Sequence, residues 1–234
     1  MKGINNDSSD VTVIIPTLNE AQNIAAVIHE LRRLGYHNIV VVDGNSKDET
    51  VEIAKGLGAR IILQEGTGKG AALRQAFEGD CINGGKVVII DADRSMRPQE
   101  IPRFIEALDS GADLAKGSRF LPLGYTKDMG LVRRVGNQFL LLLVNLIWSS
   151  HYTDLCYGFG AFNRGTLKKL YPSLRSTNFE IETEICIKAL KLKLKVVEVP
   201  SIELRRKNGK SNLSTFLDGF RILRTIIKEV VDGP

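Results

Sequence analysis

Apolar runs and amphipathic stretches alternate along the first half of the chain. Short runs rich in Val and Ile occur at Val11–Ile15, Ile39–Val42, Arg60–Leu63 and Val87–Ile90, and helical patterns occur at Glu20–Leu34, Lys47–Leu57, Ala71–Phe77 and Pro98–Leu108. A further strand is predicted at Asp113–Lys116. Nearly all-apolar strands that alternate with helices are typical of a parallel sheet covered on both faces. The pattern predicts an α/β fold with a Rossmann-like, mostly parallel sheet flanked by helices.

The second half of the chain has longer helical patterns. It predicts a helix at Leu131–Trp148, a loop at Thr153–Gly160, a helix at Ile181–Leu192, a strand pair at Val196–Val199 and Ile202–Arg206, and a final helix at Thr215–Val231. On the final helix Phe216, Phe220, Leu223, Ile227 and Val230 share one face, and Arg221, Arg224, Thr225 and Lys228 share the other. This helix is amphipathic and basic, so its apolar face either packs against the core or lies on a membrane surface.

Composition narrows the class of protein. With 234 residues, 43% hydrophobic and 25% charged, the chain has the size and balance of one globular domain rather than a disordered or polytopic membrane protein. A net charge of +5 favours an anionic partner, which leaves nucleotide phosphates, nucleic acid or an acidic membrane surface open. Only 6% of residues are aromatic, and they are not interleaved with the basic ones, which argues against nucleic acid.

Three features indicate a cytoplasmic protein. The longest apolar stretch, Phe139–Trp148, is interrupted by Asn145 and is shorter than the roughly 20 residues that cross a bilayer. The polar first ten residues do not resemble a secretory signal. The cysteines are odd in number and widely separated, which suggests reduced thiols: Cys81, Cys156 and Cys186.

Polar residues follow the predicted strands. Asp91-Ala92-Asp93 comes directly after an apolar strand, and two carboxylates one residue apart can hold a hard divalent cation that bridges the diphosphate of a nucleotide-sugar. Asp-x-Asp also arises by chance in surface turns. Because ligands of open α/β sheets bind at the carboxyl edge, the other strand ends matter too, and Glu20, Asp43 and Arg119 follow three of them.

Several short sequence blocks, in this order along the chain, extend the set of candidate site residues. They are Ile14-Ile15-Pro16-Thr17-Leu18-Asn19-Glu20, Val41-Val42-Asp43-Gly44-Asn45-Ser46-Lys47-Asp48-Glu49-Thr50, Gly68-Lys69-Gly70-Ala71-Ala72, Asp91-Ala92-Asp93, Gly117-Ser118-Arg119-Phe120 and Arg206-Lys207-Asn208-Gly209-Lys210-Ser211. Together they resemble the family 2 inverting glycosyltransferases with the GT-A fold, and among these the dolichyl- or polyprenyl-phosphate hexose synthases. The resemblance runs from Val11 to about Ile227.

The resemblance implies a donor site. It assigns Pro16, Asn19, Glu20, Asp43, Lys69, Asp91, Ala92 and Asp93 to the nucleotide-sugar. Asp43 would contact the base or ribose, while Asp91 and Asp93 would hold Mg²⁺ or Mn²⁺, Asp93 more directly. Many lipid-phosphate members have Gln two residues after the second Asp of this motif, where this chain has Ser95.

The resemblance also implies an acceptor site. Arg119 would reach the diphosphate or the acceptor phosphate, and Arg133 or Arg134 would meet a lipid phosphate, with Asn137 where some members have Ser. The remaining acceptor residues would be Glu182, Arg206, Lys210 and Ser211.

The acceptor decides which catalytic group is needed. A sugar hydroxyl must lose its proton to a carboxylate, for which Asp154 or Glu182 would serve. A lipid phosphate is already ionised at neutral pH and must only be held in line with C1, which arginines can do.

We therefore expect one GT-A catalytic domain with a nucleotide-sugar half (11–120), an acceptor half (121–212) and an amphipathic helix (213–234). The expected reaction moves a hexose from UDP-glucose or GDP-mannose to a polyprenyl or dolichyl phosphate, with inversion and a divalent metal. A soluble or saccharide acceptor, and a non-catalytic lipid- or nucleotide-binding subunit, remain alternatives. Close relatives carry C-terminal transmembrane helices that this sequence lacks, so we expect peripheral attachment at the inner face of the cell membrane, a membrane-anchoring partner or a homo-oligomer.

Overall fold

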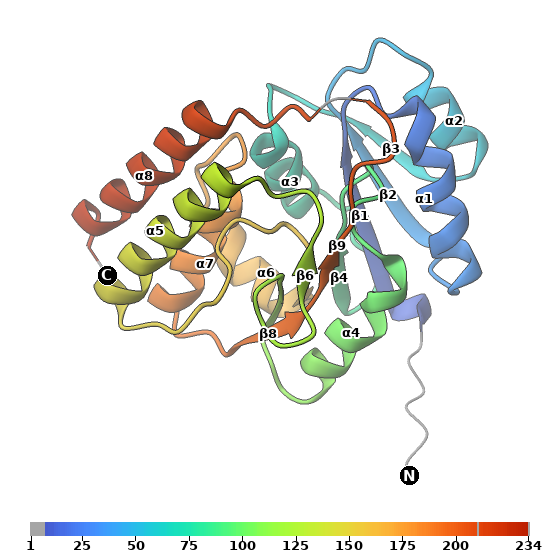
Figure 1. Cartoon of the computed structure of the whole chain (residues 1–234). Helices are drawn as coiled ribbons and strands as arrows, with labels where there is room; N and C mark the ends of the chain where they lie inside the picture. The colour runs from blue at the N-terminus through green and yellow to red at the C-terminus, as the bar shows by residue number, and fades with distance from the viewer. Residues whose placement is uncertain (1–7, 210, 234) are drawn as a thin grey trace.

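A seven-stranded sheet forms the centre of the protein, in a computed structural model that describes residues 8–209 and 211–233 (Figure 1). Its strand order is β3-β2-β1-β4-β7-β5-β8, and all neighbours are parallel except β7, which is antiparallel to β4 and β5. The strands are β1 (Val11–Thr17), β2 (Asn38–Asp43), β3 (Arg60–Leu63), β4 (Lys86–Ile89), β5 (Leu114–Ser118), β7 (Gly160–Asn163) and β8 (Val196–Pro200). The short strands β6 (Tyr125–Thr126) and β9 (Ile202–Glu203) form a separate parallel pair.

Helices cover both faces of this sheet. The α-helices of the described residues are α1 (Ala21–Arg33), α2 (Thr50–Gly56), α3 (Lys69–Glu78), α4 (Ile101–Asp109), α5 (Leu131–Trp148), α6 (Arg164–Leu170), α7 (Ile181–Lys191) and α8 (Thr215–Val231). One core joins α1, α2 and α4 to the sheet, with Phe104 stacked on Phe159 at 4.4 Å between ring centroids. A second core joins α3, α6 and α7 to the opposite face. The predicted mostly parallel α/β class is confirmed.

Helices α5 and α8 form a further layer outside α7. Leu140, Leu141 and Val144 of α5 pack with Ile222 and Ile226 of α8 in a third core, which also includes α7 side chains. Buried Glu229 fixes α8 to α7, because its Oε2 lies 2.8 Å from Lys188 Nζ and 2.9 Å from Lys191 Nζ. Figure 1 shows α5 and α8 side by side, away from α1 and α2.

The packing of α8 leaves most of the apolar face of its helical wheel exposed. Ile222 and Ile226 face the core, and Leu223 is only partly buried. Exposed apolar residues of the predicted face are Phe216 (83%), Phe220 (66%), Ile227 (56%) and Val230 (48%). Burial of Ile222 and Ile226 is set by the position of α7 beneath α8, which a single-helix wheel does not contain. The larger apolar face of α8 is therefore open.

Two segments of the second half differ from the sequence prediction. The expected strand pair is divided, because β8 joins the main sheet beside β5 whereas β9 pairs with β6. The antiparallel strand β7 follows the predicted loop at Thr153–Gly160 and was not predicted. It is four residues long and contains Gly160 and Asn163, so it lacks the Val- and Ile-rich run that marks the parallel strands.

Among the described residues, α5 is the one helix long and apolar enough to cross a membrane by length and composition, which is weak evidence of a span. Its inner side chains pack on α7 and α8.

Candidate active site

A cavity of about 400 Å³ opens at the carboxyl ends of β1, β2 and β4 and extends to the start of α5 and α8. Of the residues expected at the site, eleven line it: Pro16, Glu20, Lys69, Asp91, Ala92, Asp93, Arg119, Arg133, Glu182, Arg206 and Ser211. Described residues that were expected there but do not line it are Asn19, Asp43, Arg134, Asn137 and Asp154. Lys210 lies outside the described residues.

Lys69 joins two carboxylates on one wall of the cavity. Its Nζ lies 2.7 Å from Asp91 Oδ1 and 2.8 Å from Glu182 Oε1, and its side chain is 8% exposed. Burial opposes the charged form of Lys69, but the two carboxylates outweigh this and raise its pKa. For Asp91, burial raises the pKa to about 6. Lys69 acts against this rise and Asp93 adds to it. The result is a compact group of one cation and two anions.

Glycines on both sides of Lys69 allow close packing of the loop that follows β3. Gly68 has φ of 91°, and a Cβ there would lie 2.4 Å from Thr177 O. A Cβ on Gly70 would lie 2.6 Å from Ser176 O. The Gly-Lys-Gly block therefore lets this loop press against residues 176–178 and directs Lys69 toward Asp91.

Replacing Gly70 with alanine is expected to reduce the free energy of unfolding by about 2 kcal/mol, because the new methyl group meets backbone atoms that cannot rotate away. Gly219→Ala in α8 is the matched control, since a Cβ there meets nothing within 4 Å and should stabilise the helix by about 0.5–1 kcal/mol. Urea unfolding of both variants measures the difference. Equal stability of the two variants would contradict this account of the Gly-Lys-Gly block.

A second cation, Arg206, binds Asp93, the other carboxylate of the Asp91-Ala92-Asp93 motif. Its Nη1 lies 2.6 Å from Glu20 Oε1 and its Nη2 lies 3.2 Å from Asp93 Oδ2. Asp93 Oδ1 accepts a hydrogen bond from the backbone N–H of Ser95 at 2.9 Å. Arg206 belongs to the segment that links β9 to α8. This segment of the second half of the chain therefore lies over the loops that follow β1 and β4.

Asp91 and Asp93 fit a hard divalent cation as a partial set of ligands. Among the described residues no third His, Cys, Asp or Glu joins them in a metal-binding group. Ser95 is buried, at 6% exposure, and uses its backbone N–H on Asp93. An ion held by two carboxylates leaves positions for water and for phosphate oxygens, which is the arrangement that Mg²⁺ uses in phosphate chemistry.

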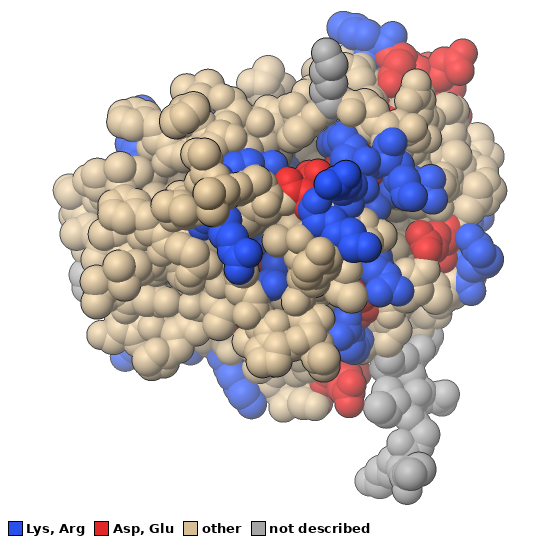
Figure 2. All heavy atoms as spheres, in the orientation of Figure 1, with Lys and Arg blue, Asp and Glu red and all other residues tan. Residues whose placement is uncertain are grey.

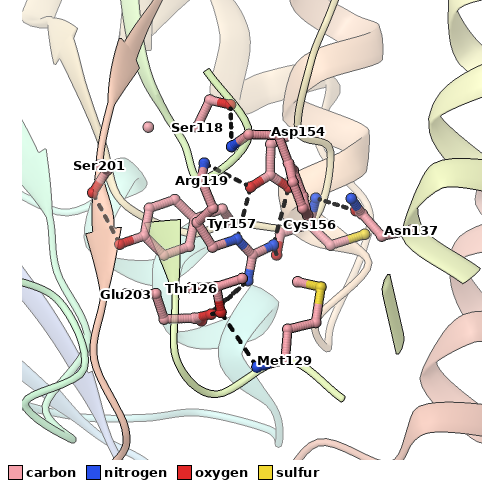
Figure 3. Close-up of polar contacts among 12 residues, drawn as sticks. Ser118, Arg119, Thr126, Met129, Asn137, Asp154, Cys156, Tyr157, Ser201 and Glu203 are labelled. Carbon is pink, nitrogen blue, oxygen red and sulfur yellow. Dashed lines mark hydrogen bonds and ion pairs between the residues drawn. The ribbon is translucent and has the colours of Figure 1, made fainter. Parts of the chain in front are cut away.

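Arg119 is held between two acids rather than free in the cavity (Figure 3). Its Nε and Nη2 donate to the carboxylate of Asp154 at 2.7 and 3.0 Å, and its Nη1 donates to Glu203 Oε1 at 3.0 Å. The guanidinium carbon also lies 4.7 Å from the ring centroid of Tyr157. Arg119 therefore joins the end of β5 to β9 and to the loop that carries Asp154.

Asp154 is enclosed, which bears on its expected role as a base. Its side chain is 0% exposed, and burial, which favours the neutral acid, is outweighed by Arg119, so the pKa of Asp154 is lowered. A carboxylate that is buried, bound to a guanidinium and outside the cavity lining has no path to an acceptor hydroxyl. Of the two bases considered from sequence, Glu182 is the one that lines the cavity.

Asp43 and Asn19 shape loops instead of facing the cavity. The carboxylate of buried Asp43 accepts hydrogen bonds from the N–H and Oγ of Ser46 at 2.8 and 2.5 Å. Asn19, with φ of 56°, accepts from the N–H of Lys47 at 2.7 Å. These bonds tie the loops after β1 and β2 together, and in this arrangement Asp43 does not present its carboxylate to a ligand.

On the acceptor side the structure separates the two neighbouring arginines. Arg133 lines the cavity, whereas the Arg134 guanidinium lies 5.6 Å from the ring centroid of Phe120. Asn137 is buried and its Oδ1 accepts from Cys156 N–H at 3.3 Å, while no group of the described residues hydrogen-bonds to its Nδ2. Arg133 is thus the arginine of this pair that can meet a ligand in the cavity.

Among the cavity residues missed from sequence are three with polar or charged side chains that bear on the site: Gln64, Glu203 and Arg221. Gln64 directly follows β3, so the rule that singled out the other strand ends would have included it. Glu203 and Arg221 carry no comparable sequence signal, because their places depend on β9 and α8 crossing to this edge of the sheet.

Comparison with known proteins places the chain in a family. Residues 12–171 match the protein family described as glycosyl transferase family 2. The chain is 34% identical over 210 residues to glycosyltransferase AglJ of Haloferax volcanii, covering 89% of this chain and 68% of that protein. It is 30% identical over 221 residues to the dolichyl-phosphate hexose transferase of the same organism, covering 94% of this chain and 93% of that protein.

Solved structures agree at the level of the fold. Glucosyl-3-phosphoglycerate synthase from Mycobacterium tuberculosis, in complex with Mn²⁺, uridine diphosphate and glucosyl-3-phosphoglycerate, superposes with a TM-score of 0.73 at 22% identity, covering 94% of this chain and 80% of that chain. The chain belongs to glycosyl transferase family 2, has the GT-A fold and is a glycosyltransferase. The expected family and fold are thereby confirmed.

Proposed function

We propose that the protein transfers a hexose from a nucleotide-sugar, UDP-glucose or GDP-mannose, to the phosphate of a polyprenyl or dolichyl lipid, with inversion at C1. The observation that carries this proposal is the course of the cavity. It runs from the carboxylates of Asp91 and Asp93 to Arg133, in the first turn of α5, and to Arg221, in the second turn of α8. Both helices have exposed apolar side chains. An acceptor with an anionic head and an apolar tail fits such a path. The relatives named dolichyl-phosphate hexose transferase and polyprenol monophosphomannose synthase support this acceptor class.

The donor's diphosphate would lie between acidic and basic side chains of the cavity. Asp91 and Asp93 would hold Mg²⁺ or Mn²⁺, which offsets the negative charge on the departing nucleoside diphosphate. Lys69 and Arg206, which now neutralise these carboxylates, are close enough to meet phosphate oxygens as well. Structural neighbours bound to Mn²⁺ or Mg²⁺ with uridine diphosphate support this use of the site.

A phosphate acceptor removes the need for a general base. Its nucleophilic oxygen is ionised at neutral pH, so the protein must hold it in line with C1 and keep water away. Arg133 is the cavity residue placed to do this from α5, and Arg221 faces the cavity from α8. Asp154, enclosed with Arg119, is not required in such a mechanism.

An acceptor with a hydroxyl nucleophile is the second candidate, and Glu182 in the cavity wall is the observation that favours it. Glu182 Oε1 is already bound to Lys69 Nζ at 2.8 Å, so an acceptor hydroxyl would have to compete with this cation for the carboxylate. This candidate makes Glu182 essential for turnover, whereas the lipid-phosphate reaction uses it only to orient Lys69.

The test is release of nucleoside diphosphate from UDP-glucose and GDP-mannose by purified protein with Mn²⁺. Each donor is assayed without acceptor, with a short polyprenyl phosphate, and with 3-phosphoglycerate as a soluble phosphate. Release that requires the polyprenyl phosphate, with a β-linked product by NMR, supports the proposal and identifies the donor. Release only with the soluble acceptor, or equal release in all three conditions, contradicts it.

Membrane contact is the second part of the proposal. Exposed apolar side chains on α5 and α8 are Leu131, Val132, Val135, Phe139, Leu142, Leu146, Ile147, Phe216, Leu217, Phe220, Ile227, Val230 and Val231. Figure 2 shows few charges over these helices, whereas Lys and Arg gather around an acidic patch nearer the middle of this face. Apolar side chains beside basic ones suit an anionic bilayer surface. We therefore propose peripheral attachment at the cytoplasmic face of the membrane.

The double substitution Phe216→Ser with Phe220→Ser should weaken binding to vesicles of anionic phospholipid by at least about tenfold, because two exposed aromatic rings no longer enter the bilayer. Leu34→Ser with Leu63→Ser, two exposed leucines outside α5 and α8, is the matched control. Flotation of both variants measures binding, and unchanged melting temperatures exclude unfolding. Equal binding by both variants would contradict membrane contact through α8.

A further inference from the structure

The loops after β1, β2 and β3 form one connected floor at the end of the cavity away from α5. Gly44 N–H donates to Thr17 O at 2.8 Å, and Gln64 N–H donates to Asp43 O at 2.8 Å. Thr17, Gly44 and Gln64 all line the cavity. If the diphosphate lies at Asp91 and Asp93, as the proposed function requires, this floor is where the base of the nucleotide-sugar arrives, since nucleotides lie across the carboxyl edge of such sheets.

The residue expected to read the base from this floor is turned away. Asp43 is 0% exposed, and its carboxylate is used by the N–H and Oγ of Ser46. Reaching a ligand would require both bonds to break and the loop after β2 to move. If a side chain of this floor distinguishes one base from another, it is one other than Asp43.

Gln64 has the geometry for this task. Its side chain is 6% exposed, and its Nε2 donates to Gly68 O at 2.8 Å, which fixes the orientation of the amide. Among the described residues, no donor contacts its Oε1. A Cβ on Gly44 would lie 3.2 Å from this oxygen, so the glycine leaves the acceptor uncovered. A nearly buried acceptor held in one orientation favours a ligand that brings a donor.

We propose that Gln64 Oε1 accepts the ring N–H of the donor's base and thereby restricts the enzyme to uracil and guanine nucleotides. Uracil N3 and guanine N1 each carry a hydrogen on this edge. Cytosine N3 and adenine N1 are acceptors there and would face the amide oxygen with a lone pair. A site built around a hydrogen bond rejects analogues that cannot form it, because the buried polar group is left unpaired.

Binding to the wild-type protein tests the donor directly, without a variant that could misfold. Calorimetry with Mn²⁺ compares UDP, GDP, CDP and ADP, and then the N3-methyl derivative of UDP and the N1-methyl derivative of GDP. We expect UDP or GDP to bind at least about tenfold more tightly than CDP and ADP, and to lose about tenfold on methylation. CDP or ADP binding as tightly as the better of UDP and GDP would overturn the inference.

The variant Gln64→Leu assigns the effect to this residue. It should weaken binding of the preferred nucleotide by about tenfold and make its methylated derivative bind no worse than the parent. Gln22→Leu, which changes an exposed glutamine on α1, is the matched control and should bind all nucleotides as the wild type does. Thermal melting confirms that both variants are folded.

The outcomes separate this inference from the proposed function. Tight binding of UDP or GDP that is insensitive to methylation and to Gln64→Leu overturns the role of Gln64 and leaves the donor class in place. Absence of binding by every nucleotide overturns both. Sensitivity to methylation that persists unchanged in Gln64→Leu assigns base reading to another residue and also overturns the inference.

Discussion

Asp93→Ala is expected to reduce turnover by about a thousandfold, because it removes a carboxylate from the proposed metal site at the point where negative charge develops on the leaving group. Arg206 also loses its contact with this carboxylate, while its bond to Glu20 remains. The measurement is release of nucleoside diphosphate in the presence of Mn²⁺ and a polyprenyl phosphate. Calorimetric titration with Mn²⁺ and the nucleotide should show that metal-dependent binding is lost together with turnover.

The matched control for this substitution is Asp109→Asn. Asp109 lies at the end of α4, forms an exposed ion pair with Lys86 at 2.8 Å and does not line the cavity. Its replacement should leave turnover unchanged and alter stability by no more than about 1 kcal/mol. If Asp93→Ala keeps more than about a tenth of the activity, the charge on the leaving group is stabilised elsewhere, and Lys69 and Arg206 become the principal candidates.

Arg119→Met is expected to produce the largest loss of stability, about 4 kcal/mol in the free energy of unfolding at pH 7. The substitution leaves Asp154 fully buried without its cation and also removes the cation bound to Glu203, which keeps its hydrogen bond from Thr126 Oγ1. Breaking one side of a buried ion pair is costly because the remaining charge is isolated from water. Urea unfolding measures the loss, and Arg103→Met is the control because the Arg103 side chain is 43% exposed in its pair with Glu100.

The pH dependence of this loss has a definite sign. In the wild type the pKa of Asp154 is lowered: burial favours the neutral acid, but Arg119 outweighs it. The stability that this pair contributes is therefore present above the ordinary aspartate range and falls as pH drops through the lowered pKa. Without the Arg119 guanidinium the main opposition to burial is removed, so we expect the pKa of Asp154 to rise and the variant to lose stability as pH increases. The difference between the two proteins should grow toward neutral pH and shrink in acid.

A double substitution separates electrostatics from packing. Arg119→Met with Asp154→Asn removes the isolated charge and should recover a substantial part of the lost stability relative to Arg119→Met alone. If the double variant is less stable than the single one, the cost comes from lost packing against Tyr157 and not from the unpaired carboxylate.

The order of helices and strands could be predicted from the sequence because burial imposes a local pattern. The runs around Val11–Thr17 and Lys86–Ile89 are apolar on both faces, and helix α8 has the bounds that its pattern predicted. The carboxyl-edge rule likewise identified Asp91 and Asp93, because a residue that follows a strand is placed by the backbone itself, whereas Lys69 was assigned from the family resemblance. These predictions needed only neighbours within one element.

The partners of the charged residues could not be read in this way, because they come from distant parts of the chain. Arg206 reaches Glu20 across 186 positions, and Arg119 reaches Glu203 across 84. Whether Asp43 and Asp154 face a ligand or the protein interior depends on which donors the folded chain brings to them. The sequence determined that acids and bases meet at one edge of a parallel sheet. Tertiary structure alone decided which of them are paired and enclosed, and which side of α8 is buried, because those outcomes depend on packing between separate elements.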